Sequence, residues 1–195
     1  MRAPRVLVLA SVVLLAACGG GSPKIADAQL PKLVLQPADL PRVFSQFDVG
    51  RQVRLDRVPG PRFDTTRFGR EDGWKARYNR PGSRSTRGPL VVESRVDLFR
   101  DAAGATNDLA AYREQFRREP DVGIGEDFSG LGDDAVTWTR VQPGPPAVRY
   151  VSVAWSDANV TASVSVNGFA TKLKPADALA LARAQERHIA AALGR

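Results

Sequence analysis

The 195-residue chain contains one cysteine and one histidine. One cysteine cannot form an intramolecular disulfide, and one cysteine with one histidine cannot supply a Cys/His zinc cluster. A serine–histidine–aspartate triad would depend entirely on His188, near the end of a predicted helix. The chain also lacks the phosphate-binding G-x-x-x-x-G-K-[ST] pattern and the G-x-S-x-G nucleophile elbow. We therefore expect no enzyme activity, no metal site and no dissociable cofactor.

A hydrophobic run long enough to cross a bilayer is missing from the N-terminus. Residues 6–17 are twelve residues with nothing more polar than Ser11, whereas a membrane-spanning helix needs about 20. Two arginines precede this run, which ends in Leu-Ala-Ala-Cys-Gly at residues 15–19. The pattern resembles the signal peptide and lipobox of bacterial lipoproteins, which implies a diacylglyceryl group on Cys18. The alternative is an ordinary cleaved signal peptide with an idle cysteine.

The N-terminal pattern predicts the organisation of the whole chain. We expect a lipoprotein signal peptide at 1–17, a lipidated Cys18 with a flexible tether at 18–32, and a single α+β domain at 33–195. Two or three acyl chains anchor a protein firmly, which a single chain does not. The predicted location is the outer face of the bacterial cell membrane, with the lipid anchor as the contact to the bilayer.

Positive charge is concentrated in one segment. The chain has 28 Lys+Arg against 21 Asp+Glu, and residues 51–87 contain eleven basic and four acidic residues. Aromatic residues are interleaved with ten arginines there, and this mixture suggests nucleic acid in a cytoplasmic protein. Export removes nucleic acid from the expected partners and favours anionic lipid or a wall polymer. The candidates for that contact are Arg51, Arg54, Arg57, Arg62, Arg67, Arg70, Arg77, Arg80, Arg84 and Arg87.

Two other uses of these arginines remain open. They could simply solvate an edge hairpin, or they could dock within the molecule against the acidic segment 119–134. That segment holds six carboxylates and no lysine or arginine. It could bind calcium or serve a hydrolase as an acid/base pair, but Asp133 and Asp134 are equally suited to turn and capping chemistry.

Apolar alternation predicts six strands, at 44–55, 74–78, 90–98, 135–141, 148–155 and 160–166. Three- and four-residue spacings predict helices at 102–118, after an Asp101 cap, and at 175–193. We read the Gly-Ile-Gly at 123–125 as a turn. The order strand, strand, strand, helix occurs twice, which favours an α+β fold: an antiparallel sheet of about six strands with two helices on one face. The serines and threonine at 161, 163 and 165 suggest that the other face is solvated or lines a shallow groove.

Four aromatic residues are candidates for a ligand groove: Trp74, Tyr78, Trp138 and Trp155. Each lies in a strand pattern, so a place in the core is the competing interpretation.

Several separate pieces of the sequence are familiar together. They are the lipobox, the opening at 35–41, the Gly-Leu-Gly-Asp-Asp-Ala at 130–135, and Asn159-Val160 followed by the helix around 178–182. The combination resembles envelope lipoproteins of actinobacterial type, similar in layout to the extracellular sensor-like domains of mycobacterial-type kinases. The 23 arginines against five lysines are compatible with a high-GC genome. The resemblance implies an envelope location and a non-catalytic domain that contacts an envelope protein, lipid or wall polymer.

Overall fold

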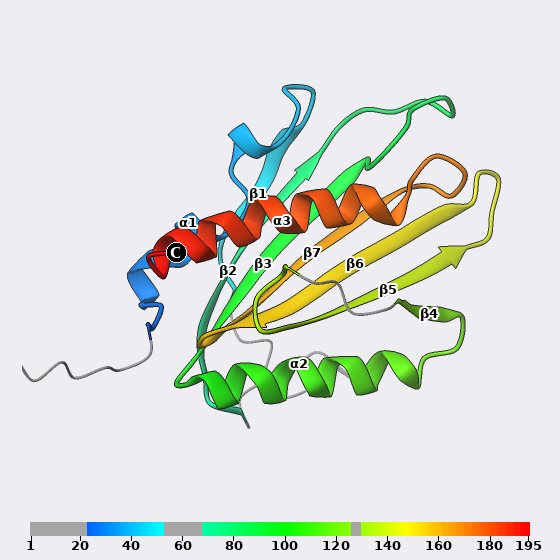
Figure 1. The fold of residues 1–195 in the computed structure, drawn as a ribbon. Coiled ribbons are helices and arrows are strands. Elements are labelled where there is room, and N and C mark those ends of the chain that lie inside the picture. Colours follow the sequence, from blue (N-terminus) through cyan, green and yellow to red (C-terminus); the bar gives the residue numbers. More distant parts are fainter. Residues whose placement is uncertain (1–22, 53–67, 126–129) are drawn as a thin grey trace, which may run out of the picture.

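A seven-stranded antiparallel sheet forms the centre of the protein in the computed structural model, which describes residues 23–52, 68–125 and 130–195 (Figure 1). Its strands are β1 (Ser45–Arg51), β2 (Arg70–Asn79), β3 (Val91–Phe99), β4 (Val122–Gly125), β5 (Asp134–Gln142), β6 (Val148–Asp157) and β7 (Val160–Phe169). The helices are α1 (Leu30–Leu33), α2 (Ala102–Arg117) and α3 (Pro175–Ala192), with 3-10 turns η1 (Asp27–Gln29) and η2 (Pro37–Asp39).

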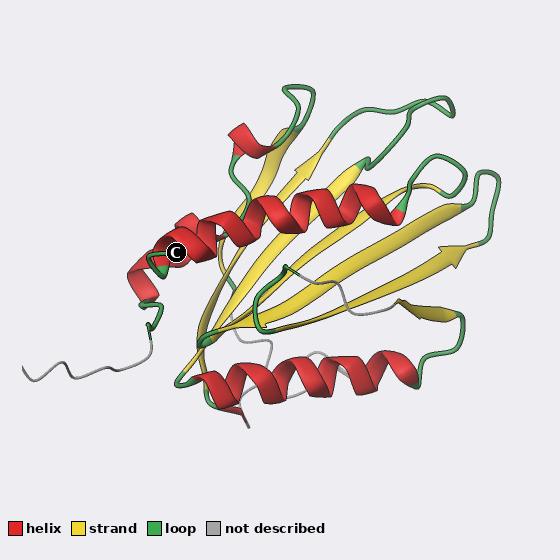
Figure 2. Cartoon of the chain, viewed as in Figure 1, coloured by secondary structure: helices red, strands yellow, loops and turns green. Residues whose placement is uncertain are grey.

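The strand order β1-β2-β3-β7-β6-β5-β4 follows from two antiparallel meanders (Figure 2). The first runs β1 to β3 and ends in α2, and the second runs β4 to β7 and ends in α3. Strands β3 and β7 pair in the middle and join the two halves into one sheet. The α+β class and the antiparallel sheet are therefore confirmed.

The seventh strand is β4, which the sequence analysis read as a turn. Its residues pair with β5, from Val122 opposite Arg140 to Gly125 opposite Thr137. A four-residue edge strand with two glycines has no alternation to detect. The glycines fit because β5 lies close: a Cβ on Gly125 would overlap the hydroxyl oxygen of Thr137.

The two long helices begin and end within a residue of the predicted positions. Asp101 caps α2, and its carboxylate accepts a hydrogen bond from the Gly104 backbone N–H at 2.9 Å. Gly104 is required by packing, since a Cβ there would overlap the carbonyl oxygen of Phe68 and lie 3.2 Å from the Phe99 Cβ. The internal glycine thus allows close contact between α2 and the end of β3.

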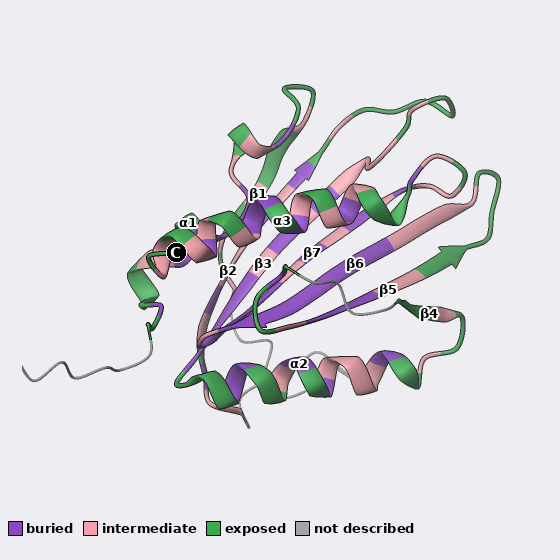
Figure 3. Cartoon of the chain, in the orientation of Figure 1, coloured by how far each residue is buried: buried purple, intermediate pink, exposed green. Residues whose placement is uncertain are grey.

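The helices pack on opposite faces of the sheet, so the prediction of two helices on one face is wrong. Val153 and Trp155 of β6 share a core cluster with Ala182 of α3, whereas Ala154 between them packs with Leu109 of α2. We call these sides the α3 face and the α2 face. Strand β6 is buried from Val151 to its end (Figure 3). Because β6 carries small or apolar side chains on both faces of the sheet, both faces must be covered by other elements.

The N-terminal segment packs against the α3 face. Ile25 and Leu30, which the sequence analysis assigned to the tether, are 2% and 1% exposed. Asn159 holds Ile25 from both sides, accepting from its N–H at 2.8 Å and donating to its carbonyl at 3.1 Å. The opening at 35–41 follows, where Leu35 donates its N–H to the Ser94 hydroxyl and accepts from the Tyr78 hydroxyl.

Candidate binding surface

The four aromatic groove candidates do not line one groove. Trp155 and Tyr78 are 0% and 1% exposed in the core under α3, so their assignment to an open groove is wrong. Trp74 packs against the same core. Trp138 lies on the α2 face, stacked on Phe116 of α2 with ring centroids 4.4 Å apart. Successive side chains of a strand point to opposite faces of the sheet, and most of these rings lie on a face that a helix covers.

Most of the described arginines between 51 and 87 are engaged within the molecule. Arg51 pairs with Asp27 and Asp72, and Arg70 is buried with its Nε 2.6 Å from Asp97. Arg80 donates to the carbonyl oxygens of Pro89 and Arg87.

The remaining arginines of that segment divide into three groups. Arg77 lies 3.0 Å from Glu93 and 3.7 Å from Asp48. Arg84 and Arg87 are exposed. Arg54, Arg57, Arg62 and Arg67 lie outside the described residues. The described arginines therefore do not form a single cationic patch.

Two of the described carboxylates of the acidic segment have structural partners. Asp134 accepts a hydrogen bond from Arg113 at 2.8 Å, and Asp133 accepts one from the Ala158 N–H at 3.3 Å. Glu126 and Asp127 lie outside the described residues. In the part of the chain that the structure describes, no cluster of three or more histidine, cysteine or acidic side chains could hold a metal ion.

The polar residues that the structure does bring together lie on the α2 face. Helix α2 packs against β4 to β7 and β3, and beyond it the face continues across β3, β2 and β1. Two cross-strand rows follow from the register. One consists of Asp48, Arg77, Glu93, Ser165 and Ser152, and the other of Gly50, Lys75, Arg95, Ser163 and Ala154.

We call the partly exposed polar side chains of these rows the open face: Asp48, Lys75, Arg77, Glu93, Arg95, Ser163 and Ser165. The relative exposure of its charged side chains is 30–38%. They can therefore reach a molecule placed against the sheet, which the fully buried aromatics cannot.

Lys75 and Arg95 are direct cross-strand neighbours on the open face. Two like charges in that position destabilise a sheet unless anions offset them. Asp48 lies 2.6 Å from the Lys75 ammonium, and Asp97 lies 3.3 Å from one terminal nitrogen of Arg95. The Arg95 Nε is itself buried and has no hydrogen-bond partner among the described residues. Lys75 and Arg95 thus place two partly exposed cations side by side on the open face.

Helix α2 borders the open face with a second polar group. The Thr161 hydroxyl donates to the Asp108 carboxylate at 3.0 Å. Burial, and then the neighbouring Asp97 carboxylate, raises the pKa of Asp108 to about 6. The arginines Arg95 and Arg70 act in the opposite direction. Charge beside the open face therefore changes near pH 6.

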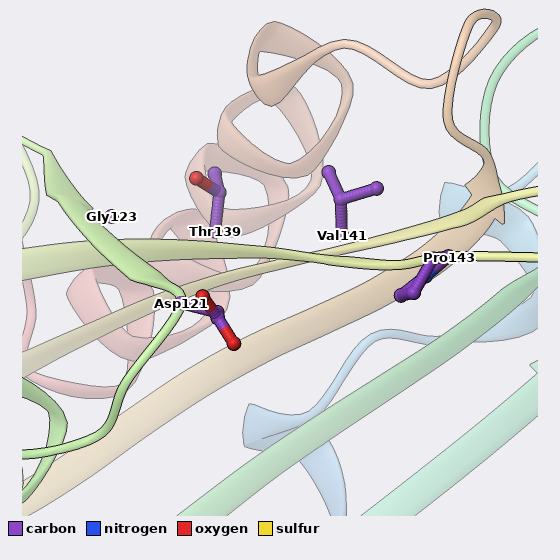
Figure 4. Close-up of a pocket in the computed structure, with 5 residues that line it drawn as sticks. All are labelled: Asp121, Gly123, Thr139, Val141 and Pro143. Carbon is purple, nitrogen blue, oxygen red and sulfur yellow. The ribbon is translucent and has the colours of Figure 1, made fainter.

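A shallow pocket lies at the other edge of the sheet, on the opposite face. Asp121 and Gly123 border it from β4 and the residues before it, and Thr139, Val141 and Pro143 border it from β5 and the turn after it (Figure 4). Asp121 supplies its only charged side chain. The small set of polar groups offers less for recognition than the open face does.

From the sequence, Arg77 was predicted only as a candidate for an anionic contact, and Ser163 and Ser165 only as part of a solvated or groove-lining face. Glu93, Arg95 and Asp97 alternate with apolar residues, which is a signal for a wet face. Their partners come from β1, β2 and β7, and that register is set by the fold. No local signal in the sequence places Lys75 beside Arg95.

Comparison with family models and with curated proteins gave no match. Among solved structures, the chain is similar to the extracellular domain of PknH from Mycobacterium tuberculosis. The TM-score is 0.66 at 12% identity, over 87% of this chain and 99% of that domain. At this identity the likeness shows a shared fold. The described helices include none with the length and hydrophobicity needed to cross a membrane.

Proposed function

We propose that this chain is an exported, lipid-anchored and non-catalytic binding module of the bacterial cell envelope. The likeness to an extracellular domain supports the location, and so does the lipobox-like sequence ending at Cys18. Cys18 lies outside the described residues. Two carboxylates of the acidic segment, Asp134 and Asp133, are held by Arg113 and a backbone N–H, which favours a binding role over hydrolysis.

The observation that carries the binding role is the pair Lys75 and Arg95 on the open face. Two adjacent and partly exposed cations suit a small anionic ligand, such as a carboxylate or phosphate ester. Hydroxyls of Ser163 and Ser165 beside the pair add neutral donors and acceptors. We propose that the ligand of this module is an anionic envelope metabolite or lipid headgroup.

Native mass spectrometry of the processed protein, purified gently in detergent, tests this proposal. We expect a co-purifying mass of lipid or metabolite size on the wild-type protein. Arg95→Gln should lose it, because the amide removes the charge. Arg118→Gln, at the exposed end of α2, removes the same charge elsewhere and should retain it. A bare wild-type mass, or equal retention by both variants, would contradict a ligand site at Arg95.

A further inference from the structure

Four loops gather at the end of the sheet where β1 begins and β2 ends. They are residues 41–44, 80–90, 143–147 and 170–174, and none contains an aspartate or a glutamate. Five cations project from three of them: Arg42, Arg84, Arg87, Lys172 and Lys174. We call these five residues the distal basic surface.

Backbone contacts hold these loops together as one surface. The Gly88 N–H donates to the Lys172 carbonyl at 3.1 Å, and Ala170 donates to Ala147 at 2.9 Å. The Arg80 guanidinium lies 5.1 Å from the centre of the Phe44 ring, which links the first loop to the second. The five cations are thus brought together from positions up to 132 residues apart in the chain.

The cations of the distal basic surface have no ion-pair partner among the described residues, whereas many other cations of the molecule have one. No carboxylate among the described residues lies within ion-pair distance of any of its five members. Asp177, the next acid after Lys174, accepts the Lys174 backbone N–H at 2.8 Å and so caps α3. Elsewhere, Arg51, Arg70, Lys75, Arg77, Arg95 and Arg195 each have a carboxylate partner.

The N-terminal segment lies at the opposite end of the sheet (Figure 1). Ile25 is bonded to Asn159 in the β6–β7 turn, and Asp27 is paired with Arg51 at the end of β1. Ten-residue strands such as β2 and β6 span roughly 33 Å. Screening acts over about 8 Å at physiological ionic strength, so a bilayer held at the N-terminal end would not engage the distal cations.

We infer that the distal basic surface binds a linear polyanion of the cell wall, with phosphodiester or carboxylate groups along its length. The choice of wall polymer over membrane lipid rests on the proposed function, because the lipid anchor would hold the other end of the sheet at the bilayer. An extended row of free cations fits repeated anionic groups. The same spread would leave most of the cations unused by a single small anion.

The test uses the processed protein in detergent, with immobilised polygalacturonate and long-chain polyphosphate as probes and neutral dextran as the blank. We expect binding to both polyanions, none to dextran, and steep weakening between 50 and 300 mM NaCl. The triple variant Arg84→Gln, Arg87→Gln and Lys174→Gln should bind at least about tenfold more weakly, since each near-surface cation contributes about 1 kcal/mol.

A matched variant separates a local surface from overall charge. Lys24→Gln, Lys32→Gln and Arg100→Gln remove the same three charges from exposed positions away from the distal end, and should bind within about twofold of wild type. Equal loss in the two triples would overturn the inference, as would absence of polyanion binding.

A vesicle comparison addresses membrane lipid as the partner. The anchor contributes equally to binding of phosphatidylcholine vesicles with and without 30% phosphatidylglycerol. The difference in binding between the two therefore measures contact with the anionic headgroup. If the distal triple lowers the phosphatidylglycerol-dependent part and leaves polymer binding unchanged, the inference is overturned. Polymer binding in solution does not require the anchor, so a protein without an acyl mass would refute the proposed function separately.

Discussion

At the scale of single residues, Glu186 links the stability of the fold to pH. The Trp155 ring N–H donates to its carboxylate at 2.6 Å, and the neighbouring Asp157 is 3% exposed and paired with Arg195. Burial, and then Asp157, raises the pKa of Glu186 to about 7 from 4.5. The folded protein therefore holds a proton that the unfolded chain has released. The contribution of Glu186 to stability should therefore fall as pH rises from about 4.5 to 7 and should not change further above that range.

Glu186→Gln should remove this pH dependence. The amide keeps an acceptor for Trp155 and offers a donor to Asp157, so no partner is lost. At pH 8 we expect the free energy of unfolding of the variant to exceed that of wild type by about 1–2 kcal/mol. This value converts the pKa shift of Glu186 to free energy and is reduced because the side chain is partly exposed. At pH 4 we expect little difference. Urea unfolding at pH 4, 6 and 8 measures both.

Glu114→Gln is the matched control, since Glu114 is exposed on α2 and pairs with Arg118. Its effect should be small at every pH. An unchanged slope in Glu186→Gln between pH 5 and 7 would assign the raised pKa elsewhere. The sequence offered no route to this carboxyl group, because Trp155, Asp157 and Arg195 approach it only in the folded chain.

At the scale of structural elements, the loop before β5 requires a glycine at one position of the 130–135 motif. Gly132 has φ +50°, and a Cβ there would overlap the Ser156 carbonyl oxygen and lie 2.9 Å from Trp155 Cδ1. The next residue, Asp133, donates its N–H to that same carbonyl at 2.8 Å. The second glycine of the 130–135 motif thus lets the loop lie directly on the end of β6.

Gly132→Ala should cost about 2–4 kcal/mol, because it adds overlap with backbone to a strained left-handed conformation. Gly130→Ala is the control: its φ is +86°, but nothing lies within 4 Å of the added Cβ. It should cost only about 1 kcal/mol from backbone strain. Thermal unfolding of the two variants gives the comparison, and equal losses would remove the packing explanation.

Apolar periodicity in the sequence predicts some of these elements and not others. Six strands and both long helices follow from periodicity, because their apolar faces are long enough to read. Strand β4 does not, since Gly123 and Gly125 carry no side chain and pairing with β5 alone defines it. The sequence pattern also did not predict which face of the sheet α2 covers. Val136 and Ala154 are outward positions in an alternating pattern until Leu109 is placed over them.

At the scale of the whole molecule, the fold redistributes charge that the sequence presents as one segment. Residues 51–87 contain eleven basic residues, yet Arg70 is buried on Asp97 and Arg77 faces Glu93. Arg84 and Arg87 instead join Lys172 and Lys174, from the far end of the chain, through the contact between Gly88 and Lys172. Counting charges along the sequence finds the excess but cannot separate the paired cations from the free ones.

The orientation of this charge relative to the bilayer would follow from the proposed lipid anchor, which gives the last prediction. Seven residues from Cys18 to Ile25 reach at most about 25 Å, so an acylated Cys18 keeps the N-terminal end of the sheet near the bilayer. Cys18→Ala should abolish the acyl mass increment and release or misprocess the protein, as fractionation and intact mass would show. Ser22→Ala, four residues along, should leave both unchanged.

A Cys18→Ala protein that stays membrane-bound would exclude the lipid as the anchor. Loss of the anchor together with retained binding to polygalacturonate would show that the two ends of the sheet act separately. The packed N-terminal segment would then attach one end to the bilayer, while the distal basic surface presents its cations to the wall. The antiparallel sheet fixes that separation, because its strands begin and end at those two surfaces.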